Sequence, residues 1–232
     1  MSQLALPLKL QDHAVFESFL PAGNETLVAY LSSLVASQGE PGCWLFGAKA
    51  TGKSHLLQAV CERVGDRAQY VPIAQFSAGG AAILDGLGNR PFVCLDDIDR
   101  IAGNAEWELA LFQLFNVLAD NQHTVICAAQ VPPRECGFRL ADLASRCARL
   151  ATFQVTTLGE AQRIDALRLR ARHRGLELPD ETASFLLSRS RRDMQSLYEL
   201  LDRLDSESLR AKRRLTVPFV REVLGLSQAD SA

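Results

Sequence analysis

The sequence predicts an α/β protein with a parallel sheet, followed by a small all-α domain. Over the first two thirds of the chain, short apolar runs alternate with longer helical patterns. Several of these runs are apolar almost throughout, which is typical of parallel strands covered on both faces. After about residue 155 the strand pattern stops and only helical patterns follow. Strands that alternate with helices build βαβ units, and a helical tail without strands indicates a separate unit.

Each element of this prediction has its own signal. Strands are expected at residues 43–46, 69–73, 91–95, 123–129 and 151–155. Helical spacing predicts helices at 25–36, 54–64 and 106–121, and Asn24 is a candidate N-cap for the first of them. In the third helix we expect one apolar side, formed by Leu109, Leu111, Phe112, Phe115 and Leu118. In the tail, helices are expected at 160–173, 179–188, 192–212 and 218–224, with Gly175 as a C-cap and Pro179 in a first turn.

The composition is that of an ordinary globular chain. Of its 232 residues, 47% are hydrophobic and 22% are charged, and the formal net charge is −2. These values exclude disorder as the main state and exclude a basic surface over the whole molecule. No apolar run reaches the ~18 residues of a membrane span, and the N-terminus lacks the basic region of a secretory signal. The six cysteines form no CxxC pair, so we expect a reduced, cytoplasmic protein.

A phosphate-binding motif follows the first predicted strand. Residues 47–54 read Gly-Ala-Lys-Ala-Thr-Gly-Lys-Ser and match GxxxxGK[ST] directly before a helix, which is the context that this motif requires. Gly47 and Gly52 permit backbone angles closed to other residues, so that loop N–H groups converge on phosphate oxygens. Lys53 is expected to bind the β- and γ-phosphates and Ser54 to bind Mg²⁺. Ala50, Thr51 and His55 complete the predicted contacts with ADP or ATP.

A second acidic motif ends the third predicted strand. Asp96 and Asp97 follow an apolar run and lie at its carboxyl end. We expect Asp96 to hold the magnesium of the nucleotide through water. Asp97 is the candidate that orients or deprotonates the attacking water. Because aspartate is one methylene shorter than glutamate, we expect the chain's own hydrolysis to be weak.

This order of motifs resembles the AAA+ ATPases, and within them the DnaA replication-initiator clade. The resemblance rests on residues 3–8, the loop 47–54, the Asp-Leu-Ala-Ser-Arg of 142–146, and residues 191–197 with 215–224 after them. It implies an AAA+ core with a helical lid. The chain is most similar to the regulatory inactivators of DnaA, which lack the DNA-binding domain of DnaA. Since the chain ends soon after the lid, we expect no sequence-specific DNA binding. The predicted parts are an N-terminal peptide (1–12), an α/β nucleotide-binding domain (13–156) and a lid (157–232).

The resemblance implies two partners and a role for each matching residue. Residues 3–8 resemble the peptide by which replication proteins bind the DNA polymerase III sliding clamp (its beta subunit), and the residues expected to make this contact are Gln3, Leu4, Leu6, Pro7 and Leu8. Arg146 matches an arginine finger that acts in trans on DnaA, with Arg149 as a second candidate, and Arg192 matches the lid arginine that reaches the nucleotide. Gln130 stands where the family usually has a shorter polar sensor of the γ-phosphate, which again indicates weak hydrolysis.

The leading interpretation is a nucleotide-bound negative regulator of replication initiation that stimulates hydrolysis of DnaA-bound ATP. Two alternatives stay open: an autonomous AAA+ motor or loader, and a DnaA-binding adaptor without catalytic contribution. A homo-dimer or higher oligomer is also open. The basic run at Arg163, Arg168, Arg170, Arg172 and Arg174 is interpreted as a solvated helix face, with weak contact to DNA that threads a nearby clamp as the alternative.

Overall fold

The computed structural model describes residues 14–37, 39–189 and 194–226. The chain divides into two compact units. The first comprises Gly23–Thr156 and the described residues before Glu17. The second comprises Glu17–Ala22 and the described residues from Thr157 onward. Glu17–Ala22 thus groups with the helical unit, although the sequence placed it in the α/β domain. Within the described ranges, no helix is both long enough and apolar enough to cross a membrane.

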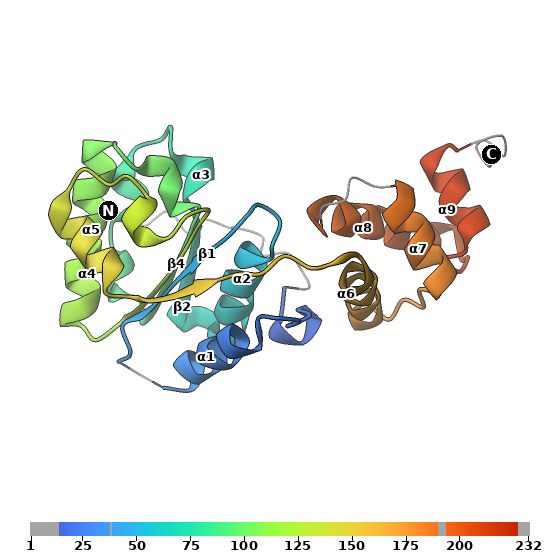
Figure 1. Ribbon diagram of the computed structural model, residues 1–232, viewed down its shortest axis with the longest axis horizontal. Helices are drawn as coiled ribbons and strands as arrows, with labels where there is room; N and C mark the ends of the chain where they lie inside the picture. Colours follow the sequence, from blue (N-terminus) through green and yellow to red (C-terminus); the bar gives the residue numbers. More distant parts are fainter. Residues whose placement is uncertain (1–13, 38, 190–193, 227–232) are drawn as a thin grey trace. The chain divides into compact units, whose positions relative to one another are not determined.

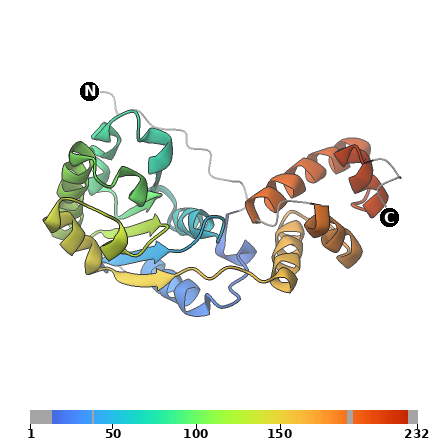
Figure 2. The ribbon, with the colours of Figure 1, turned by 45° about the horizontal axis from the view of Figure 1, so that its top comes forward.

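The first unit is built on a parallel five-stranded sheet in the order β2-β3-β4-β1-β5. Its strands are β1 (Gly42–Phe46), β2 (Ala68–Pro72), β3 (Phe92–Asp96), β4 (Thr124–Ala129) and β5 (Ala151–Gln154). All five predicted runs are therefore strands, with ends that differ by at most one residue. Helices α1 (Glu25–Ala36) and α2 (Lys53–Val64) cover one face, and α3 (Ile73–Phe76), α4 (Ala105–Asp120) and α5 (Ala141–Ala148) cover the other (Figures 1 and 2).

Short 3-10 turns connect these elements. They are η1 (Phe16–Ser18), η2 (Gly65–Arg67), η3 (Ala81–Leu84), η4 (Leu87–Asn89), η5 (Ile98–Ile101) and η6 (Pro133–Glu135). Asn24 is the N-cap residue of α1, as predicted, but its side chain makes no capping hydrogen bond. Its Oδ1 instead accepts a hydrogen bond of 2.8 Å from the Thr156 N–H, so Asn24 ties the start of α1 to the chain that follows β5.

The core between the sheet and α4 is apolar, with one charged exception. On α4, the side chains of Trp107, Leu111, Leu114, Phe115 and Leu118 are buried against the sheet. Of the predicted apolar side, Leu109 is instead 52% exposed, whereas Leu111, Phe115 and Leu118 are buried as expected. The exception is Glu108, which lies on the buried face with only 1% of its surface exposed. All six cysteines are also buried, and burial raises the pKa of the Cys43 thiol to about 12.

The second unit contains the helices α6 (Glu160–His173), α7 (Asp180–Arg189), α8 (Met194–Ala211) and α9 (Val217–Leu224). Its apolar core is centred on Leu167, Leu186, Leu201 and Phe219. The sequence predicted a solvated face for Arg170 and Arg174, but both side chains are packed against α8. Arg170 is 1% exposed and stacks on the Tyr198 ring at 4.2 Å, and Arg174 pairs with Asp202 of α8 at 2.5 Å. The α/β unit and this helical lid confirm the predicted fold class.

Candidate nucleotide-binding site

The topology brings three predicted segments to one edge of the sheet. In a parallel sheet all carboxyl ends lie at the same edge, where ligands of open α/β sheets bind. Strand β4 lies between β1 and β3, so Gln130, directly after β4, stands between the loop after β1 and the acidic residues after β3. The edge therefore combines a glycine-rich loop, an amide and carboxylates within one unit.

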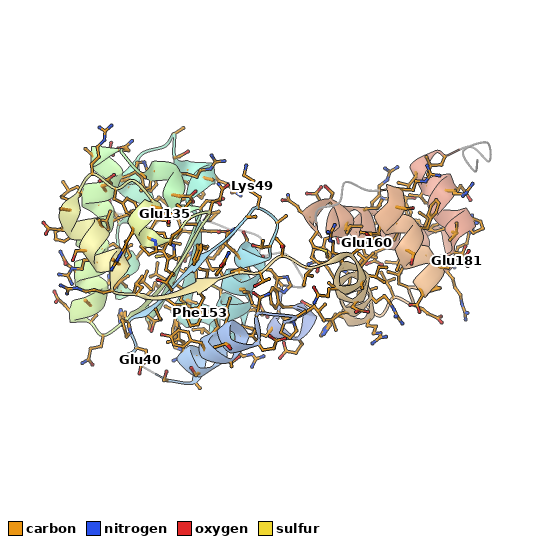
Figure 3. All side chains as sticks on the ribbon, viewed as in Figure 1. Glu40, Lys49, Glu135, Phe153, Glu160 and Glu181 are labelled. Carbon is orange, nitrogen blue, oxygen red and sulfur yellow. The ribbon has the colours of Figure 1, made fainter. Side chains whose placement is uncertain are left out.

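The loop between β1 and α2 has the backbone that its glycines predict. Gly47 and Gly52 have φ angles of 151° and 97°, and Ala50 is also left-handed at 59°. A Cβ on Gly47 would meet the Val155 carbonyl oxygen at 2.7 Å, so only glycine fits there. Helix α2 begins at Lys53, and the free N–H groups of its first turn favour an anion. Lys49 is exposed and extends outward from the loop (Figure 3).

Lys53 is a buried ammonium group inside this loop. Its side chain donates to the carbonyl oxygens of Gly47 (2.8 Å) and Ala48 (2.7 Å), and 6% of the residue is exposed. Burial lowers the pKa of Lys53, and the nearby carboxylates of Asp96, Asp97 and Asp99 oppose this shift. The ammonium is held directly by neutral main-chain carbonyls, and an anionic phosphate beside it would be a stronger acceptor.

Asp96 ends β3 and is 3% exposed. Its two carboxylate oxygens accept from different donors, the Tyr70 hydroxyl at 2.7 Å and the Asp97 N–H at 3.1 Å. Burial and the charge of Asp96 raise the pKa of Tyr70, so the phenol stays protonated and remains a donor. The sequence reading missed Tyr70. Tyr70 can reach Asp96 because β2 pairs with β3, and the sequence alone does not give the register of that pairing.

Asp97 follows in a left-handed backbone conformation, with φ of 56°. Burial, with the charges of Asp96 and Asp99, raises its pKa above the ordinary value. A raised pKa makes a carboxylate a stronger base as long as it stays ionised at the working pH, so this environment is compatible with Asp97 as a base. Gln130 contacts the same acidic turn, since its amide lies 3.4 Å from the Asp99 carboxylate.

The remaining predicted contacts differ in how they are held. Ser54 is exposed in the first turn of α2, while the Thr51 hydroxyl donates to the Ala48 carbonyl at 3.0 Å. The His55 ring contacts the Val15 carbonyl at 2.9 Å, so in this structure it binds its own chain. The loop backbone, the ammonium of Lys53, the hydroxyl of Ser54 and the carboxylate of Asp96 together fit a nucleoside polyphosphate with Mg²⁺.

Arg146 lies in a second part of the α/β unit. It lies inside helix α5. Its guanidinium lies 5.9 Å from the centre of the Phe112 ring of α4, and the residue is partly exposed. Arg149, the second candidate, directly follows α5 and is exposed.

Two groups of predicted residues lie outside the described residues. They are Arg192 of the lid and the peptide residues Gln3, Leu4, Leu6, Pro7 and Leu8. The neighbouring Arg189 is described, and its guanidinium lies 5.8 Å from the Phe185 ring.

Comparisons with known proteins agree with this fold. Residues 160–224 match the family model described as Hda, lid domain. Domain III of the Thermotoga maritima replication initiation protein DnaA is similar in structure, with a TM-score of 0.76 and 18% identity over 93% of this chain and 97% of that one. AMPPCP-bound DnaA from Aquifex aeolicus is similar with a TM-score of 0.68 and 20% identity, over 84% of this chain and 65% of that one. The Thermotoga maritima RuvB Holliday junction branch migration motor is similar with a TM-score of 0.59 and 18% identity, over 90% of this chain and 70% of that one.

Proposed function

We propose that this Hda-like homologue of DnaA is a nucleotide-bound regulator of replication that acts on DnaA. One combination of features carries the proposal: an Hda-type lid follows an α/β unit with a phosphate loop and an arginine on a surface helix. In its full form the proposal has three parts. The chain holds ADP or ATP, binds the DNA-loaded sliding clamp, and supplies Arg146 to the ATP site of DnaA.

The nucleotide part rests on Lys53 and the loop around it. The loop N–H groups and the Lys53 ammonium bind phosphate oxygens, and Ser54 and Asp96 hold Mg²⁺ directly or through water. The magnesium, when bound, neutralises phosphate charge. The solved DnaA structure with AMPPCP supports an adenine nucleotide as the ligand. Arg192, which lies outside the described residues, is proposed to reach the same nucleotide from the lid.

The trans-acting part rests on Arg146. A guanidinium that enters a neighbour's site neutralises charge on the transferred phosphoryl group, which accelerates hydrolysis by about 10³–10⁵-fold. The chain's own hydrolysis is proposed to be weak, because Asp97 reaches less far than a glutamate would and Gln130 already contacts Asp99. The result would be DnaA in its ADP-bound form and a block on repeated initiation.

ATP turnover by the purified chain, alone and with DnaA, clamp and DNA, separates this proposal from its alternatives. We expect slow turnover alone and fast turnover only in the complete mixture. An autonomous motor would instead turn over ATP without DnaA and lose function on Asp97→Asn. A pure adaptor would keep its function on Lys53→Ala. Unchanged turnover in the complete mixture would contradict the proposal.

The clamp part is tested by binding. The full chain should be retained by immobilised sliding clamp, and Gln3→Ala should release it, because the glutamine side chain is proposed to hydrogen-bond the clamp while Leu6 and Leu8 enter an apolar pocket. A matched change outside the peptide, Gln69→Ala on β2, should leave retention unchanged. Equal retention of the wild type and Gln3→Ala would contradict this part.

A further inference from the structure

Glu108 is a buried carboxylate that faces main-chain N–H groups from two separate loops. Its Oε1 accepts from the Gly103 N–H at 2.6 Å, and its Oε2 accepts from the Leu140 N–H at 2.7 Å. The Arg139 N–H lies 3.1 Å from Oε1 and 2.9 Å from Oε2. The residue is 1% exposed. Both oxygens are therefore fully used, and the charge is compensated by directed hydrogen bonds.

These hydrogen bonds keep Glu108 ionised. Burial alone would raise its pKa, but the N–H groups of Leu140, Gly103 and Arg139 outweigh burial and hold the pKa below its ordinary value. The carboxylate also lies in the first turn of α4 and beside the first residues of α5, where helix N-termini favour negative charge. A permanently charged group can hold both loops without titrating at neutral pH.

The two loops that Glu108 joins have different neighbours. Gly103 follows η5, the turn that comes directly after Asp96 and Asp97. Arg139 and Leu140 precede α5, the helix that carries Arg146, and Leu140 is the N-cap residue of that helix. The Arg139 side chain lies over Gly103, close enough that a Cβ there would meet its Nε at 3.7 Å. One carboxylate thus fixes the start of α5 to the turn behind the acidic motif.

The other end of α5 contacts the same face of α4. Phe112, one turn after Glu108, has the Arg146 guanidinium 5.9 Å from its ring centre. Residues four apart on a helix lie on one side, so α4 holds α5 at both ends. We propose that Glu108 is a positioning residue for Arg146: it holds α5 in the orientation from which the guanidinium can enter the neighbouring active site. The inference rests on the proposed role of Arg146.

The test measures hydrolysis of DnaA-bound ATP as the concentration of the chain is varied. Glu108→Gln keeps the size of the side chain but replaces one acceptor oxygen by an N–H donor that faces other donors. Because a misplacement of about 1 Å can cost ~100-fold in rate, we expect the maximal stimulated rate to fall by about 10- to 100-fold. The half-saturating concentration and the chain's nucleotide affinity should change by less than about twofold. Glu106→Gln is the matched control, since Glu106 is an exposed glutamate on the same helix.

A double variant separates positioning from general damage. If Glu108 acts through Arg146, then Glu108→Gln combined with Arg146→Ala should be no slower than Arg146→Ala alone. An additive loss, a shifted half-saturation or an unchanged rate for Glu108→Gln would overturn the inference. Should Glu108→Gln not fold, Phe112→Leu provides the same test at the other end of α5, because Phe112 is partly exposed and contacts Arg146. We expect a smaller loss of the stimulated rate, and again no further loss when the change is combined with Arg146→Ala.

Amide hydrogen exchange gives a readout that does not depend on DnaA. In Glu108→Gln the amides of residues 139–149 should exchange faster than in the wild type, while those of α2 should not change. Unchanged exchange in α5 would overturn the inference. Wild-type chain that fails to stimulate DnaA would contradict the proposed function instead, and exchange alone would then decide whether Glu108 positions α5.

Discussion

The α/β unit and the lid both bury charged side chains, but they compensate them differently. In the α/β unit, Lys53 and Glu108 are held by main-chain groups of loops, through hydrogen bonds of 2.6–3.1 Å. In the lid, Arg170 stacks on the Tyr198 ring, and its buried Nε has no hydrogen-bond partner. Directed bonds to loops fix the shape of a site, whereas a cation on a ring joins two helices. The first kind should matter for function and the second for stability.

The largest effect expected from this comparison is on the lid. Arg170→Ala removes the desolvated cation–π contact and leaves a cavity, so we expect the free energy of unfolding to fall by about 3 kcal/mol. Arg170→Met is the matched control. It keeps the packing and removes a buried charge, so its stability should stay within ~1 kcal/mol of the wild type. Denaturant unfolding of the full chain measures both. Equal losses for the two variants would mean that the charge, rather than the packing, holds α6 to α8.

The next effect is on ligand affinity in the α/β unit. Lys53→Ala removes charge-assisted hydrogen bonds to phosphate and should weaken ADP binding by about 10- to 100-fold, measured by calorimetry. Stability without nucleotide should change little, because removal of a buried ammonium offsets the lost hydrogen bonds. Lys49→Ala, at the exposed lysine of the same loop, should bind within about twofold of the wild type. A loss of affinity of the same size for both lysines would contradict the special role of the buried one.

A smaller effect concerns the magnesium dependence of that site. Tyr70→Phe removes the hydroxyl that holds Asp96 but keeps the ring, so the carboxylate is free to turn. We expect nucleotide affinity in EDTA to be unchanged. The Mg²⁺ concentration that gives half of the Mg²⁺-dependent gain in nucleotide affinity should rise by about two- to tenfold, because the net value of one hydrogen bond is of this size. Tyr30→Phe, on α1, is the control with the same chemical change. An equal shift for the two variants would show that Asp96 is not oriented by Tyr70.

The smallest effect is a pH dependence that has opposite signs at two carboxylates of the α/β unit. Because the pKa of Glu108 is lowered in the folded chain, its contribution to stability is present above its unfolded pKa of about 4.5 and is lost as the pH falls through the folded value. The pKa of Asp97 is raised, so its ionisation opposes folding as the pH rises above about 3.8.

Two variants measure these signs. Glu108→Gln should flatten the acid side of the stability curve, and Asp97→Asn should raise stability slightly at neutral pH, since asparagine tolerates the left-handed backbone at that position. The free energy of unfolding between pH 3 and pH 7 checks both. A lower stability of Asp97→Asn at neutral pH would show that the charged carboxylate of Asp97 is favourable in the folded chain.

The sequence predicted the strands and the phosphate loop because both depend on local patterns. Apolar runs and the glycine spacing need no knowledge of distant neighbours. Glu108 and Tyr70 were missed because their partners are remote: Leu140 is 32 residues from Glu108, and Asp96 is 26 residues from Tyr70. A local signal for Glu108 existed, because it lies three and seven residues before the buried Leu111 and Phe115. An acidic residue on an apolar stripe indicates a buried, compensated charge.

The basic run of α6 failed as a prediction for the same reason. Charge alone suggested a solvated face, but Arg170 shares its side of the helix with the buried Leu167, one turn earlier. Whether such an arginine is buried depends on what faces it, here Tyr198 and Asp202 of α8. Periodicity identifies the face of a helix and leaves the partner on the next helix undetermined.

Single-turnover hydrolysis of labelled ATP bound in advance to DnaA shows directly whether Arg146 acts in trans. With clamp, DNA and unlabelled nucleotide-bound chain present, only the DnaA site can release labelled product. We predict that the wild-type chain accelerates release, that Arg146→Ala loses about 10³-fold or more of this acceleration, and that Arg149→Ala, at the exposed arginine directly after α5, keeps most of it. Full acceleration by Arg146→Ala would show that Arg146 does not act on the ATP site of DnaA.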